Sequence, residues 1–413
     1  MSEDSSTGKR ASPAAAPAPG IRWGPFTARV PFVHARAEWP EMVQNFVVAG
    51  ATGLAVVPIF VTAFGMTFEL AVSLCIVQAF ILCSSFFLFG EPFCPGWVTP
   101  ALPLVLAAAM AVEGIPDRIA FVTAVVIVTG LIFFLLGITR LGALFIRLVP
   151  LPLKAGIIFG AGLSAIVGEF SPRGESIARV LEYPVCITLS TGVTLLLLFS
   201  QPLEKLKARF GWLAVLGGLG MAPGFILAMV IGPWVSEVNY DKFKELFFDP
   251  VSGDFVFTLG DLFFLPDITG LVSGYSLFSS ESGIMENLEP GIFLAALPLS
   301  LAAYVIAFGD IVTGTAILKS ARAERQDEDI ELDEHRTHLS LGIRNLVQVA
   351  VCGPFFPLQG PLWTGAMVVV VERYRRGRDA MRSIFDGIFS YYLFGVPLLL
   401  FFKPLIFLYE PVL

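Results

Sequence analysis

The sequence predicts an all-α polytopic membrane protein. Of its 413 residues, 55% are hydrophobic, only 15% are charged, and 38 are phenylalanine. The mean hydropathy is strongly positive. Apolar stretches of about 20 residues, each long enough to cross about 30 Å of hydrocarbon, recur from Met42 to the C-terminus. These stretches leave little room for a soluble domain.

Four segments divide the chain. Residues 1–41 are polar and rich in alanine and proline, so we expect a disordered tail. We expect seven spans in residues 42–235, an acidic extracytoplasmic segment in residues 236–290, and about four spans in residues 291–413. The eleven expected spans are at about residues 42–64, 69–89, 96–112, 118–138, 151–168, 183–200, 212–235, 291–318, 339–353, 360–372 and 384–409.

Lysine and arginine are biased to one side of this arrangement, which predicts a cytoplasmic N-terminus. That side carries the tail, Arg140, Arg147, and the loops Lys205–Arg209, Lys319–Arg336 and Arg373–Arg378. Residues 236–289 lie on the other side and hold ten acidic residues and two lysines. The tail has no apolar core of signal-peptide length, so the first span should insert the chain. We expect an integral, multi-pass protein of the plasma membrane or a bacterial inner membrane.

Two spans are irregular in the same way. The helix expected at 96–112 follows a segment with Pro92, Pro95 and Gly96, and the helix expected at 360–372 follows a similar segment that ends at Gly360 and Pro361. Proline and glycine disfavour a regular helix, so each span should be a half-helix preceded by extended chain. The alternative is an ordinary but kinked span, because these residues are common in membrane helices.

Asp310 is a lone carboxylate at the end of the apolar run Pro298–Phe308. A carboxylate at membrane depth costs several kcal/mol unless it is compensated, so such residues often mark ion and substrate pathways. Thr313 lies three residues on, on the same helix face. The two residues could hold Na⁺ through oxygen ligands, or Asp310 could carry a proton. The alternative is a carboxylate that snorkels or is hydrogen-bonded within the bundle.

An internal repeat accompanies these features. The segment Thr62–Met66 in the first span is similar to Ile306–Asp310 in the eighth, and Gly96–Ala101 in the third is similar to Gly360–Gly365 in the tenth. Both matches occur at the same span offset. Since seven spans come before the second copy, its orientation is inverted, as in inverted-repeat transporters.

With these features the chain resembles the superfamily of nucleobase–ascorbate transporters, sulfate permeases and bicarbonate transporters. The resemblance rests on Phe308-Gly309-Asp310, on the two spans that follow proline and glycine, and on the approach to the fifth span from Arg140 to Gly156. It implies a seven-plus-seven inverted repeat with core and gate domains, and a homodimer. It also implies that substrate is held between the third and tenth half-helices and the eighth span.

The chain departs from parts of this superfamily. Nucleobase permeases carry a glutamate where this chain has Ile306, and a second one near Leu362 or Trp363, which counts against nucleobase chemistry. Sulfate permeases add a soluble C-terminal domain, which does not follow here. The second repeat is expected to be truncated, about three spans short at Leu413, as in a fragment or an incompletely represented chain.

The candidate substrate site follows from the half-helices. If their N-termini point into one cavity, the unpaired N–H groups and positive dipole ends favour an anion or a polar, electron-rich solute. The candidates for substrate contact are Trp97, Val98, Thr99, Phe308, Gln359, Leu362, Trp363 and Thr364, with Asp310 and Thr313 for ion coupling. The alternative for the aromatic residues is lipid contact or core packing.

These observations predict a secondary active transporter of a small polar or anionic solute, a symporter coupled to Na⁺ or H⁺ through Asp310. An uncoupled exchanger or channel for an inorganic anion is the rival within transport. An enzyme is disfavoured, because no nucleophile constellation or metal spacing lies at membrane depth. A non-transporting scaffold is the third alternative. The expected partners are the solute and the lipid bilayer, with no nucleic acid, no metal site and no cofactor beyond Na⁺.

Overall fold

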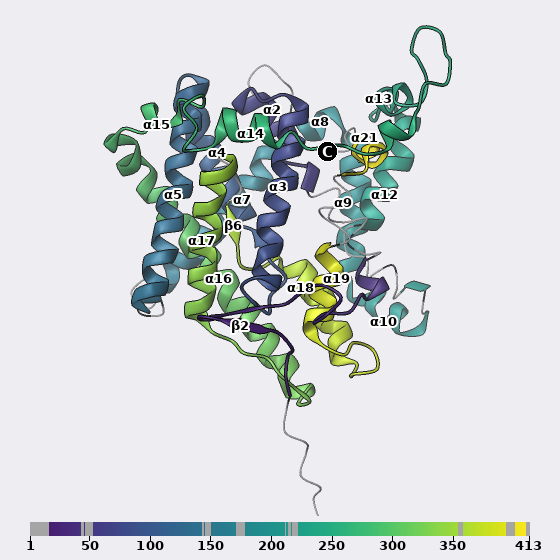
Figure 1. Cartoon of the computed structure of the whole chain (residues 1–413). Coiled ribbons are helices and arrows are strands. Elements are labelled where there is room, and N and C mark those ends of the chain that lie inside the picture. The colour runs from purple at the N-terminus through teal and green to yellow at the C-terminus, as the bar shows by residue number, and fades with distance from the viewer. Residues whose placement is uncertain are drawn as a thin grey trace, which may run out of the picture.

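The computed structural model describes residues 16–42, 45, 53–142, 144, 150–170, 178–210, 212–213, 216, 222–353, 358–393 and 401–409. In these residues the protein is a bundle of helices with a few very short strands (Figure 1). The helices of the first half are α2 (Val57–Phe64), α3 (Phe68–Phe87), η1 (Thr99–Ala101), α4 (Leu102–Met110), α5 (Ile115–Thr139), α7 (Leu151–Phe170), α8 (Arg179–Glu182), α9 (Pro184–Phe199), α10 (Gln201–Arg209), α12 (Ala222–Ile231) and η2 (Gly232–Val235).

The second half continues with short helices and then long ones. They are α13 (Asp241–Glu245), η3 (Leu259–Leu262), α14 (Ile268–Tyr275), α15 (Ile284–Asn287), α16 (Pro290–Glu324), α17 (Glu334–Cys352), α18 (Thr364–Arg375), α19 (Ile384–Leu393) and α21 (Lys403–Tyr409). The strands form three two-stranded pairs. These are β1 (Ala16–Pro17) with β5 (Glu328–Asp329), β2 (Ile21–Trp23) with β3 (Phe26–Ala28), and β4 (Gly96–Trp97) with β6 (Gln359–Gly360).

Three helices in the described part of the chain are long and apolar enough to cross a membrane, namely α3, α5 and α16. A fourth span is reached if α9 and α10, which are bent by 56°, are counted as one. Each of the eleven predicted spans overlaps at least one observed helix. The chain is therefore an all-α, multi-pass integral membrane protein, as predicted.

Local sequence explains where the helices nearest the site begin. α3 starts after Thr67, whose side chain accepts a hydrogen bond from the Leu70 N–H at 3.3 Å. α17 starts after Asp333, whose carboxylate accepts hydrogen bonds from the N–H groups of His335 and Arg336. These caps fix the start of the two helices that flank the buried polar groups described below.

α5, at the left edge of the bundle in Figure 1, packs against both α16 and α17. Glycine permits the close approach of α17, since a Cβ atom at Gly342 would lie 2.7 Å from the backbone of Phe134. An aromatic cluster fills the space among the three helices, and it consists of Phe133, Tyr304, Phe308 and His338. The Tyr304 hydroxyl lies 3.1 Å from Nε2 of His338, so this buried polar pair is mutually satisfied.

Part of the N-terminal segment contacts the bundle. Residues 1–15 lie outside the described residues, and residues 16–42 include the strands β1, β2 and β3. The rings of Trp23 and Phe26 lie 4.8 Å apart in the β2–β3 hairpin, and Phe26 is 4.9 Å from Phe89 at the end of α3. The composition of the tail as a whole hid this aromatic pair, which buries apolar surface against the bundle.

Backbone groups of the same segment bond to distant helices. The Arg29 N–H donates to the Phe87 carbonyl at 2.6 Å, and the Arg36 N–H donates to Oδ1 of Asp386 at 2.7 Å. Segment 21–38 therefore runs across one end of the bundle and ties α3 to α19.

Asp386→Ala should release only part of this segment. The Arg36 amide would lose its acceptor, while the Arg29 amide would keep the Phe87 carbonyl. We expect faster hydrogen exchange around Arg36, with unchanged exchange at Arg29, by mass spectrometry of peptides that separate the two sites. Equal acceleration at both positions, or at neither, would contradict this arrangement.

Candidate functional site

Two short helices begin at one pair of strands near the middle height of the bundle (Figure 1). β4 and β6 are antiparallel, with Gly96 opposite Gly360 and Trp97 opposite Gln359. The Val98 N–H donates to the Leu358 carbonyl at 2.8 Å. On the other side the Trp363 N–H donates to the Cys94 carbonyl at 2.7 Å. The extended segment before each short helix thus satisfies its backbone groups by pairing with the extended segment before the other. We call these two segments, residues 93–98 and 358–363, the leads, and the place where they pair the crossing.

The predicted half-helices are confirmed. η1 with α4 covers residues 99–110, and α18 covers residues 364–375. Each would extend about 18 Å as helix, little more than half of the hydrocarbon core. The predicted approach to the second half-helix includes residues 354–357, which lie outside the described residues.

Glycine is required at the crossing of the two leads. A Cβ atom at Gly96 would lie 2.7 Å from the Leu362 carbonyl oxygen, and one at Gly360 would lie 2.9 Å from the Gly96 carbonyl oxygen. Real Cβ atoms do not approach other atoms so closely. The two glycines that mark the repeat in the sequence are therefore the two that permit the strands to cross.

α16 passes directly beside this crossing. A Cβ atom at Gly314 would lie 2.9 Å from the Phe93 ring and 3.4 Å from Leu362, one residue on each lead. Asp310 is one turn before Gly314 on the same face of α16. Its side chain is half-buried, and no hydrogen bond or ion pair reaches its carboxylate from the residues that the structure describes.

Thr313 is exposed, and its hydroxyl donates to the Gly309 carbonyl of its own helix at 2.9 Å. The structure therefore does not join the two residues proposed for ion coupling by a direct hydrogen bond. The hydroxyl oxygen of Thr313 keeps its acceptor lone pairs.

The predicted substrate residues separate into two groups. Thr99 and Thr364 are exposed at the start of the two short helices, and Trp97 and Trp363 are half-buried beside them. Val98, Gln359 and Leu362 are buried in the crossing itself. Phe308 belongs to neither group. It lies in the aromatic cluster of the core, with its ring 5.9 Å from that of His338.

Gln359 belongs to a buried polar network that sequence reasoning missed. Its Nε2 donates to Oε1 of Gln78 on α3 at 2.6 Å. Its backbone N–H donates to Oδ1 of Asn345 at 3.0 Å, and the Asn345 Nδ2 donates back to the Gln359 carbonyl at 3.1 Å. Asn345 thus continues the pairing of β6 with a side chain of α17.

Arg344, the residue before Asn345, is the most informative member of this network. Its side chain is only 2% exposed, and it donates to the Gly360 carbonyl at 2.9 Å and to Oε1 of Gln359 at 3.4 Å. Its Nε is buried with no partner in the described part of the chain, and no carboxylate there lies within ion-pair distance. The sequence could have indicated Arg344, because a charged residue inside a predicted membrane span, here 339–353, is a candidate functional residue for the same reason as Asp310.

A second buried arginine on α17 is paired. Arg336 donates to Oε1 of Glu91 at 3.0 Å, and the Thr337 hydroxyl donates to the other oxygen of Glu91. Around the crossing the described residues therefore place two buried guanidinium groups against one buried carboxylate, Glu91. Glu91 forms its ion pair with Arg336, and Arg344 has no carboxylate within ion-pair distance among these residues.

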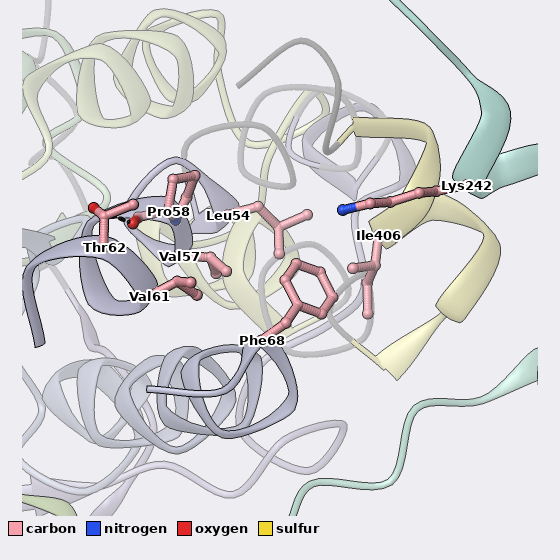
Figure 2. A pocket seen from close by; sticks show the side chains of 8 residues that line it. All are labelled: Leu54, Val57, Pro58, Val61, Thr62, Phe68, Lys242 and Ile406. Atoms are coloured by element: carbon pink, nitrogen blue, oxygen red, sulfur yellow. Dashed lines mark hydrogen bonds between the residues drawn. The ribbon is translucent and has the colours of Figure 1, made fainter. Parts of the chain in front are cut away.

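Of two cavities in the described part of the chain, the smaller lies near these helices. This cavity of about 80 Å³ is lined by Ile311, Thr315 and Lys319 of α16, together with Phe93 and Thr337. Because Phe93 also touches the Gly314 face, this polar space lies next to the crossing. A larger pocket of about 250 Å³ shares no residue with the crossing and lies elsewhere (Figure 2).

Of the comparisons with known proteins, the one with solved structures gives matches. No protein-family model matches this sequence. No curated protein matches it either. Among solved structures, the chain is similar to the transmembrane domain of a cyanobacterium bicarbonate transporter, BicA, with a TM-score of 0.44 and 14% identity over 89% of this chain and 84% of that chain. So weak a similarity assigns no activity to this chain.

Gly360→Ala should destabilise the crossing. Its methyl group would meet the Gly96 carbonyl, so the strands would have to separate, at a cost of about 1–3 kcal/mol. Gly365→Ala is the control, because a Cβ atom there would lie at an ordinary 3.4 Å from the Trp363 ring nitrogen. Thermal unfolding of the purified protein should show a lower Tm for the first variant alone. Equal Tm values for both variants would refute the steric argument.

Proposed function

We propose that this chain is a secondary active transporter of a small anion, which binds where the β4–β6 pair leads into the two short helices. One observation carries the proposal. Arg344 is a buried guanidinium with no carboxylate within ion-pair distance among the described residues, and it donates to the Gly360 carbonyl of the same strand pair from which the short helices start.

Three sources of positive potential meet at this place. Each helix N-terminus contributes the equivalent of about half an elementary charge, and the guanidinium contributes a full one. The first N–H groups of a helix have no intrahelical partner, and the hydroxyl of Thr364 is exposed at one of the two starts, while that of Thr99 donates to the Trp97 carbonyl at 3.2 Å. A small anion therefore gains hydrogen bonds and charge compensation there. A neutral nucleobase would bring no negative charge to Arg344.

Asp310 supports coupling to a cation. Its carboxylate is half-buried one turn from the Gly314 contact with both leads, and it can bind Na⁺ or a proton. A cation carried with the anion reduces the net charge that must cross a low-dielectric region. This favours symport over an uncoupled channel, which has no need of a carboxylate beside the anion site. The proposal includes the homodimer and cytoplasmic N-terminus expected from the sequence.

Arg344→Gln should abolish anion binding. Binding to the folded state stabilises a protein by about 2.7 kcal/mol at a ligand concentration of 100 times Kd, so bicarbonate, sulfate or a small carboxylate should raise the Tm of the wild type. We expect the rise to disappear in Arg344→Gln and to return in part in Arg344→Lys, because lysine restores the charge but not the fork of donors.

Arg336→Gln is the matched control, since Arg336 is equally buried on the same helix but paired with Glu91. It should lower the Tm without ligand by leaving Glu91 unpaired, yet keep the rise with anion. Loss of the rise in both variants alike would mean that Arg344 has only a structural role.

Asp310→Asn should separate binding from coupling. In liposomes, uptake of the anion driven by an inward Na⁺ or proton gradient should fall at least about tenfold, because the neutral amide neither carries a proton nor attracts Na⁺ strongly. The Tm rise with anion should remain. Thr313→Val tests whether the hydroxyl is an ion ligand, and it should weaken only Na⁺-driven uptake. Unchanged uptake in Asp310→Asn would remove Asp310 from the coupling mechanism.

A further inference from the structure

The side-chain amide of Gln359 connects Arg344 of α17 to α3. Its oxygen Oε1 accepts from Nη1 of Arg344 at 3.4 Å, and its nitrogen Nε2 donates to Oε1 of Gln78 on α3 at 2.6 Å. All three side chains are buried. The amide therefore lies between a charged donor on one helix and a neutral acceptor on another.

Gln78 determines which end of this amide faces the guanidinium. A glutamine amide accepts hydrogen bonds at its oxygen and donates them from its nitrogen, whereas a guanidinium only donates. Nε2 of Gln359 faces two acceptors of Gln78, its Oε1 and, at 3.4 Å, its backbone carbonyl. With both acceptors on the α3 side, the oxygen of Gln359 is left for Arg344. The reversed amide would place one donor against another and leave a buried group unsatisfied.

A further contact orients Gln78 in turn. Its Nε2 donates to Sγ of Cys352 at 3.2 Å, and that thiol donates to the Gln348 carbonyl at 3.4 Å. Every donor from Arg344 to Cys352 thus points the same way, an arrangement in which hydrogen bonds strengthen one another. The series begins and ends on α17, about two turns apart, and passes through β6 and α3 between those points.

The guanidinium of Arg344 has only two recorded contacts in the described part of the chain. Besides the Gln359 oxygen, the Gly360 carbonyl accepts from Nη2 at 2.9 Å, and Nε has no partner among these residues. Because the donors of arginine form a rigid planar fork, two contacts at different nitrogens fix the direction of the whole fork. A single contact would let the plane turn. The Gln359 oxygen is therefore needed to fix the guanidinium in one orientation.

We propose that Gln78 is a positioning residue for the anion site: through the amide of Gln359 it holds the guanidinium of Arg344 in the orientation that receives the anion. This inference rests on the proposed function, which it deepens. Gln78 acts only through Gln359, since its recorded side-chain bonds go to Gln359 and Cys352. An oriented guanidinium raises affinity because less freedom is lost when the anion binds.

The orientation of Arg344 is measured first, without any anion. In the full-length protein labelled with ¹⁵N-arginine, the Nε–H signal of Arg344 is the one that Arg344→Lys removes from the NMR spectrum. Gln78→Met is similar in size but offers no side-chain acceptor, so it should shift this signal, as should Gln359→Met. Ser73→Ala is the matched control, because Ser73 is equally buried on α3 but accepts from the Asp267 N–H. It should leave the signal in place.

Anion affinity is measured next, from the rise of Tm with bicarbonate concentration. Gln78→Met should raise the Kd about fivefold, which corresponds to one hydrogen bond of ordinary strength. Ser73→Ala should leave the Kd unchanged. In a Gln359→Met background, Gln78→Met should add no further loss, because the connection is already broken. Gln78→Leu provides a second variant, and the Tm of every variant without anion confirms that it is folded.

Two results would overturn the role of Gln78. One is an unshifted Arg344 signal in folded Gln78→Met and Gln78→Leu, whatever the anion does. The other is an additive loss of affinity in the double variant, which would mean that Gln78 acts by a route other than Gln359. A shifted signal in a protein whose wild type binds no anion would overturn the proposed function instead, so the two failures are distinct.

Discussion

The mutual pairing of β4 and β6 is the interaction on which the rest of the centre depends. Extended backbone within a bundle has no water to bond to, and each unpaired amide would cost about 1–3 kcal/mol. Each lead supplies the partners of the other, through Val98 with Leu358 and Trp363 with Cys94. The pairing brings both short helices to one starting point, which neither lead would reach as a regular helix.

The two buried arginines near this pairing differ in their partners, and the stability of the fold alone does not explain the difference. Arg336 and Glu91 form a buried pair that is closed by Thr337, so the charge of each compensates the other. Arg344 is equally buried two turns along the same helix, but its recorded acceptors are a carbonyl and an amide oxygen. A neutral residue would bond to such acceptors without the cost of burying a charge. Under the proposed function, an anion that binds and leaves accounts for this buried charge.

The sequence predicted the helical class, the two half-helices and the extended leads, because each follows from apolar length or from proline and glycine at fixed places. It did not predict that the aromatic pair Trp23 and Phe26 packs beside Phe89 at the end of α3. It also placed Phe308 at the substrate, whereas the structure packs that ring with His338 in the core. Gln78 and Asn345 were missed because their partner on β6 is distant in sequence.

α16 provides the physical link between the two halves of the proposed mechanism. Gly314 brings it against Phe93 and Leu362, so one helix touches both leads, and Asp310 is a single turn away. A cation on that carboxylate and an anion at the crossing would attract each other strongly, because little water separates charges in the bundle. Such attraction is a coupling free energy, and linkage makes it reciprocal, so each ion must raise the affinity for the other. In the proposed mechanism the carboxylate on α16 binds the cation and the guanidinium on α17 binds the anion, and neither has an oppositely charged group within ion-pair distance among the described residues.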